Sequence, residues 1–173
     1  MPRPYSAALP IAWVFVKLLI ILNWVMGACI IALLVALPNE QWILQAFHLT
    51  PSPDADRLVL GLRLVAGLGL CVVPLNFLLL KRLLAMIGTV RAGDPFVPAN
   101  AERLQAIAWT LLGLQLLGLV IGAIGRWVST PAHPVHLDAG FSTSGWLAVL
   151  LAFVLARVFA EGTLMRDDLD GTV

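Results

Sequence analysis

Four long runs of apolar residues divide the chain, and short polar segments separate them. A helix needs about 20 predominantly apolar residues to cross a bilayer, and each run is of that order. No run alternates apolar and polar residues as a half-buried strand would, and helices satisfy their own backbone groups in hydrocarbon. The pattern predicts an all-α integral membrane protein, a four-transmembrane-helix antiparallel bundle with spans at about 11–37, 58–80, 105–125 and 141–160.

Composition favours a bilayer as the solvent of these runs. The 173 residues are 60% hydrophobic and 12% charged, with a mean hydropathy of +0.93. Soluble domains carry about 25% charged residues, so too few charges remain here to cover a water-facing surface. The first run is too long for a signal-peptide core, and we expect it to be retained. Residues 1–173 are therefore predicted to form a single membrane domain.

The basic residues orient the predicted bundle. Lysine and arginine gather near the N-terminus, between the second and third runs, and near the C-terminus. The opposite side has little more than Arg57 and Arg126. The positive-inside rule then places both termini and the middle segment in the cytoplasm. The net charge of +1 gives no overall field that would bind nucleic acid directly.

Small residues predict how the spans pack. Lipid tails are as apolar as leucine, so close approach at small residues drives helix association in a membrane. Stripes of small residues at four-residue spacing predict seams, with the third and fourth spans as the closest pair: Ala28, Ala32 and Ala36 in the first span, Gly118 and Gly122 in the third, and Ser144, Ala148, Ala152, Ala156 and Ala160 in the fourth.

Three polar side chains inside the spans allow two interpretations. Asn23 and Gln115 lie near mid-depth, where each amide needs a partner and the two would bond to each other. Arg63 lies just inside the outer boundary of the membrane, where an arginine is energetically costly unless it forms an ion pair or is hydrated. Either these residues are structural and Arg63 snorkels outward, or they line a polar cavity that opens to the outside.

Candidates for catalysis or metal binding are few. His133 and His136 have a spacing that would place two imidazoles on one metal, with Asp138 and the more distant His48 on the same side. Prolines make this segment irregular, so an ordinary exposed loop is the better interpretation. Walker, H-E-x-x-H and dinucleotide motifs are missing. Cys29 and Cys71 differ in predicted depth by roughly 10 Å, too far for a disulfide. The sequence predicts no enzyme, no cofactor and no metal.

The cytoplasmic side carries the most distinctive polar pattern. The second helix is expected to continue beyond the membrane until Gly93, and Asp94-Pro95 then supplies a helix cap or a turn. Pro98 and Asn100 permit a new helix start, so residues of about 81–104 are predicted to form a cytoplasmic helical hairpin. The last helix extends into a cytoplasmic tail over 161–173, in which Glu161 pairs with either Arg157 or Arg103.

Two segments resemble a known family. The stretch GDPFVPANAERLQAIAW from Gly93 to Trp109 and the stretch from Phe141 to Val173 resemble the bacterial membrane family catalogued as domain of unknown function 2975. The shared marks are a G-D-x-F turn, an R-V-F-x-E-G segment and an acidic tail that ends near L-x-G-T-V. The resemblance implies four spans in a bacterial inner membrane and names no activity.

The resemblance implies a partner. Genes for such proteins often sit beside a small helix-turn-helix regulator of the Cro/repressor type, which implies a membrane protein that senses a signal and holds or releases the regulator. The family motifs and the charge pattern together mark these partner-binding candidates: Gly93, Asp94, Phe96, Arg103, Arg157, Glu161, Arg166, Asp167, Asp168 and Asp170.

Three functions follow from these observations. The first is a non-enzymatic membrane sensor or anchor that binds a helix-turn-helix transcriptional regulator at its cytoplasmic face. The second is a small carrier or channel for an ion or lipophilic molecule, with an outward-facing polar cavity near Arg63. The third is a membrane enzyme, which has the least support because the sequence contains no catalytic motif. A homo-oligomer is compatible with each of the three.

Overall fold

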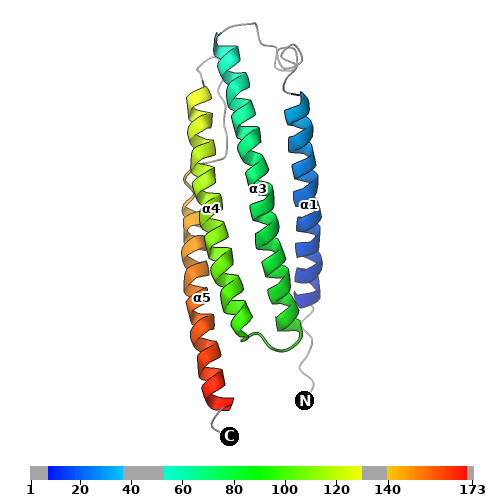
Figure 1. Ribbon diagram of the computed structural model, residues 1–173, viewed down its shortest axis with the longest axis vertical. Helices are drawn as coiled ribbons and strands as arrows, with labels where there is room; N and C mark the ends of the chain where they lie inside the picture. Colours follow the sequence, from blue (N-terminus) through cyan, green and yellow to red (C-terminus); the bar gives the residue numbers. More distant parts are fainter. Residues whose placement is uncertain (1–7, 37–52, 130–139, 171–173) are drawn as a thin grey trace. The chain divides into compact units, whose positions relative to one another are not determined.

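Four α-helices make up the computed structural model, which describes residues 8–36, 53–129 and 140–170. The helices are α1 (Ala8–Ala36), α3 (Pro53–Arg91), α4 (Pro98–Val128) and α5 (Thr143–Asp170) (Figure 1). Each is long and apolar enough to cross a membrane, and the described residues contain no strand. The prediction of an all-α protein with four membrane-spanning helices is confirmed.

All four helices are longer than the roughly 20 residues that a bilayer requires. Helix α3 has 39 residues and α4 has 31. At 1.5 Å per residue, α3 is about 58 Å long, roughly twice the thickness of the hydrocarbon core. Helix α5 is helical through Asp170, well beyond the predicted span at 141–160. The membrane boundaries themselves stay predictions, but the helices have enough length to continue past them.

Backbone chemistry ends α3 where the sequence predicted. Gly93 has a φ of 87°, a left-handed conformation that glycine adopts without a Cβ penalty. The amide of Gly93 donates to Val90 at 3.1 Å and that of Asp94 donates to Thr89 at 3.1 Å, which is a Schellman motif. Helix α4 then begins at Pro98, the first-turn position that suits proline. Asp94-Pro95 is thus a turn, the second of the two predicted alternatives.

The described residues fall into two compact units. Unit 1 comprises residues 8–23, 76–112 and 144–170, and unit 2 comprises residues 24–36, 53–75, 113–129 and 140–143. Asn23 and Gln115 are both half-buried and belong to different units, so their mutual hydrogen bond stays a prediction. Cys29 and Cys71 of unit 2 are free, as expected.

In unit 2 the helices pack closely where a valine side chain of one helix contacts a glycine of another. Val59 and Ala66 of α3 form a buried cluster with Ile30, Leu33 and Leu34 of α1 and Leu62. A Cβ built on Gly27 would lie 3.1 Å from Val73, and one on Gly61 would lie 2.1 Å from Val128. Helix α3 therefore approaches α1 at Gly27 and α4 at Gly61. The seam predicted at Ala28 and Ala32 is wrong, because both residues are exposed.

Unit 1 buries a different set of small residues. In α5, Ala152 and Ala156 are buried, whereas Ser144 and Ala148 are exposed. Each step of four residues advances about 40° beyond a full turn, so a long four-residue stripe cannot keep to one face. The predicted α5 seam therefore holds only around Ala152 and Ala156. That α4 and α5 are the closest pair stays a prediction.

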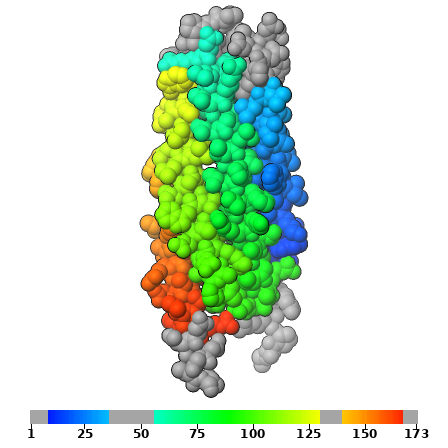
Figure 2. Space-filling view, viewed as in Figure 1, coloured from blue at the N-terminus to red at the C-terminus, as the bar shows by residue number. Residues whose placement is uncertain are grey.

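Helices α3 and α4 also adjoin in unit 1, where their green surfaces meet in Figure 2. The guanidinium of Arg82 on α3 donates to the Ala106 carbonyl at 3.1 Å and to Thr110 Oγ1 at 2.9 Å on α4. Thr110 is buried, and its hydroxyl donates to the same carbonyl at 2.7 Å. Two charge-assisted hydrogen bonds therefore join the two helices in unit 1.

Candidate functional site at the turn between α3 and α4

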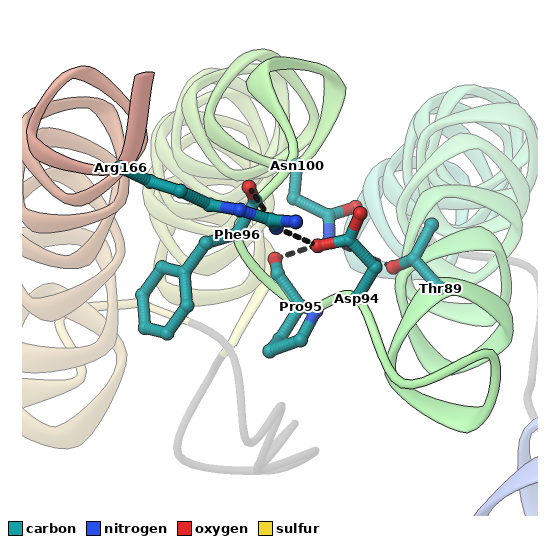
Figure 3. Close-up of polar contacts among 6 residues, drawn as sticks. All are labelled: Thr89, Asp94, Pro95, Phe96, Asn100 and Arg166. Atoms are coloured by element: carbon teal, nitrogen blue, oxygen red, sulfur yellow. Dashed lines mark hydrogen bonds and ion pairs between the residues drawn. The ribbon is translucent and has the colours of Figure 1, made fainter. Parts of the chain in front are cut away.

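A buried amide organises the turn. The side chain of Asn100, in the first turn of α4, is fully buried. Its Nδ2 donates to Thr89 Oγ1 at 2.7 Å and to the Pro95 carbonyl at 2.8 Å (Figure 3). Its Oδ1 accepts a hydrogen bond from Arg103 at 2.8 Å. A buried amide without partners would be destabilising, so these bonds hold the end of α3, the turn and the start of α4 together.

An ion pair joins the turn to α5. Figure 3 shows Arg166 of α5 extending toward Asp94, with which it forms an ion pair and a hydrogen bond. The same guanidinium lies 3.5 Å from the Phe96 carbonyl, a long contact. The side chains of Arg166 and Asp94 are 49% and 42% exposed. An exposed pair of this kind contributes about 0–1 kcal/mol, so competing charges or salt can open it.

An aromatic contact reinforces the same junction. The Phe96 ring lies 5.3 Å from the Phe159 ring, centroid to centroid. A Cβ added at Gly162 would lie 3.2 Å from Phe96 Cδ1, so the glycine provides the room that the Phe96 ring occupies. Phe96 nevertheless stays 44% exposed. The G-D-x-F turn and the R-V-F-x-E-G segment, which the sequence marked separately, are therefore in contact.

We call Thr89, Asp94, Phe96, Asn100, Phe159, Gly162 and Arg166 the turn cluster. Among the predicted partner-binding residues, Asp94, Phe96 and Arg166 meet here, and Gly93 shapes the turn. Arg103 joins through Asn100. Glu161 pairs with Arg157 at 2.5 Å, one turn apart on α5, which is the first of its two predicted partners.

The remaining candidate side chains lie outside the residues that the structure describes. The backbone of Asp167, Asp168 and Asp170 is helical, but their side chains lie outside the described residues, as do His48, His133, His136 and Asp138. In the part of the chain that the structure describes, no three His, Cys, Asp or Glu residues gather into a metal site.

The predicted cavity residue Arg63 is half-buried in unit 2. The hollow along the same stretch of α3 measures about 50 Å³, and its lining is entirely apolar: Leu58, Gly61, Leu62, Val65, Ile124, Gly125 and Val128. Arg63 does not line it. On α3 and α4 of this unit, Arg57 lies over the Trp127 ring at 4.9 Å, a cation–π contact typical of a bilayer interface.

Sequence reasoning missed several members of the cluster. It treated Asn100 only as a helix start and Arg82 only as one of the basic residues that set orientation. Thr89, Phe159 and Gly162 received no role of their own. Asn100 stands in the first turn of α4, where an asparagine is common, so its position in the sequence carried no signal of its burial.

These features define a multi-pass membrane protein with four long apolar helices and a polar turn cluster at one end of unit 1. A model of the family described as a protein of unknown function (DUF2975) matches residues 11–173, and the chain belongs to this family. The predicted family resemblance is thereby confirmed. No curated protein and no solved structure matches the chain.

Proposed function

We propose that the protein is a non-enzymatic sensor or anchor in a bacterial inner membrane, which binds a helix-turn-helix transcriptional regulator. Both termini and the α3–α4 turn lie in the cytoplasm in this proposal, as the basic residues predict. The observation that carries it is the turn cluster. Both family motifs converge on it, and it presents a half-exposed ion pair beside the exposed ring of Phe96.

The acidic tail provides the attraction. Helix α5 continues from Arg166 through Asp170, so Asp167, Asp168 and Asp170 follow directly on the residue that is tied to Asp94. A DNA-binding regulator carries a basic surface for phosphates, and clustered carboxylates compete for that surface. Binding of this kind is sensitive to salt, because exposed charges are screened beyond about 10 Å at 0.1 M ionic strength.

A signal would act through the position of α5. The pair between Asp94 and Arg166 and the contact of Phe96 with Phe159 hold α5 against the turn. A ligand or a change in the bilayer that favours a shifted position of α5 would move the tail and release the regulator. The size of this effect is set by how much more strongly the ligand or bilayer stabilises the shifted position than the docked one. The carrier alternative finds less support, because the hollow near Arg63 is apolar.

The test is co-purification of the full-length protein with the product of an adjacent regulator gene. We expect replacement of Asp167, Asp168 and Asp170 together by asparagine to weaken co-purification and to change expression of the regulator's targets. Asp56→Asn serves as the control, since Asp56 is an exposed acid in unit 2. Undiminished co-purification and unchanged expression with a folded, inserted triple variant would exclude the acidic-tail mechanism.

A further inference from the structure

A groove runs between α4 and α5 in unit 1, and no residue of the turn cluster lines it. Its volume is roughly 390 Å³, within the range of small-molecule sites. Residues of both helices line it: Ala101, Glu102 and Gln105 from α4, and Phe153, Ala156, Arg157 and Ala160 from α5. The lining is therefore amphipathic, with an acid, a base and an amide beside alanine and phenylalanine.

The two kinds of residue separate along the groove. Glu102 precedes the predicted span of α4 and Arg157 lies in the last turn of the predicted span of α5, whereas Gln105 begins the α4 span and Phe153 lies deeper in that of α5. A charge at the bilayer centre is costly, so Glu102 and Arg157 mark the interface. Trp109 lies edge-on to Phe153 at 5.1 Å and is 59% exposed, as expected of an aromatic residue near that depth. The groove thus leads from the interface toward the hydrocarbon.

Negative charge exceeds positive charge at the charged end of the groove. Arg157 already pairs with Glu161 at 2.5 Å, so its positive charge is partly neutralised. Glu102 is exposed, and no described residue forms an ion pair with it. With Glu102, Arg157 and Glu161 together, this end of the groove is net negative. It can attract a cationic group at Glu102 while Arg157 still offers N–H donors to a phosphate.

We propose that this groove binds phosphatidylethanolamine, a phospholipid whose headgroup carries a primary ammonium and a phosphate. The ammonium lies against the Glu102 carboxylate, the phosphate accepts hydrogen bonds from Arg157, and an acyl chain follows Phe153 and Ala156 into the bilayer. An anionic phospholipid lacks the ammonium and meets the net negative end of the groove, so it binds less well.

Native mass spectrometry of the full-length protein tests this proposal. The protein is offered equimolar phosphatidylethanolamine and phosphatidylglycerol, and we expect the bound ratio to favour phosphatidylethanolamine about two- to fivefold, the range of one exposed charge pair. Glu102→Gln should remove the preference, Glu102→Asp should keep it, and Arg126→Gln should leave it unchanged because Arg126 does not line the groove.

Three outcomes would overturn the proposal. The first is equal binding of the two lipids by the unaltered protein, which is the result expected of non-selective annular lipid. The second is a preference that survives in Glu102→Gln. The third is an equal loss of preference in Arg126→Gln. The exposure of Glu102 means that its replacement should leave folding intact, which thermal unfolding of each variant in detergent checks directly.

Discussion

Gly61 and Gly67 offer a matched pair of substitutions on one helix. Both lie on α3 in unit 2, but a Cβ at Gly61 would lie 2.1 Å from Val128 Cγ2, whereas a Cβ at Gly67 would have no atom within 4 Å. We predict that Gly61→Ala destabilises the protein and that Gly67→Ala is neutral or slightly stabilising. The second expectation follows from the higher helix propensity of alanine.

The size of the Gly61 effect follows from the contact. Carbon atoms pack at about 3.5–4.0 Å, so a 2.1 Å approach forces a shift. Rotation of Val128 does not relieve it, because Val128 Cβ and Cγ1 both lie 3.2 Å from the same point and the side chain is only 5% exposed. Overpacking of this kind costs about 1–3 kcal/mol. For a chain of this length each kcal/mol lowers Tm by about 2–4 °C.

The assay is thermal unfolding in one detergent, with Val128→Ala as the second arm of a double-mutant cycle. In the Val128→Ala background the two Cγ atoms are gone, so the added cost of Gly61→Ala should fall below about 1 kcal/mol. Equal Tm values for Gly61→Ala and Gly67→Ala, or additive effects in the cycle, would refute the close approach of α3 and α4 at this glycine.

Two further predictions concern orientation and the turn. Reporters fused after Val173 or within residues 91–100 should behave as cytoplasmic, and those within 132–136 as external, so that one reporter on the wrong side would contradict the orientation. Asn100→Ala should lower the free energy of unfolding by about 1–3 kcal/mol, because Asn100 is fully buried and its partners lose their hydrogen bonds. Exposed Gln105→Ala is the control, and comparable losses in chemical denaturation would argue against the role of Asn100.

Hydropathy sufficed to predict the four helices, because the bilayer demands long apolar helices and little else matches that pattern. The end of α3 was also predictable, since a glycine that follows a helical run and precedes Asp-Pro commonly ends a helix. These features depend on residues that are neighbours in sequence. The ion pair of Asp94 with Arg166 joins residues far apart in the chain, and the hydropathy pattern of the sequence does not predict such a pair.

Helix faces were harder to predict. In water the apolar face of a helix is the buried one, but in a bilayer both the protein-facing and the lipid-facing sides are apolar. Small residues at Ala28 and Ala32 therefore looked like a seam, although they are exposed and Gly27 beside them makes the contact. The turn cluster shares this difficulty, because the space that Gly162 leaves for Phe96 depends on tertiary packing.

Site-specific photo-crosslinking in intact cells tests the central claim most directly. A photoreactive phenylalanine analogue replaces Phe96 in the turn cluster or, as the control, Phe141, which is 73% exposed in unit 2 and predicted to be external. The account predicts a covalent adduct with the adjacent regulator from position 96 and none from position 141, with the adduct reduced when Asp167, Asp168 and Asp170 are replaced by asparagine. No adduct at position 96 in cells that express the regulator, or equal adducts at both positions, would contradict it.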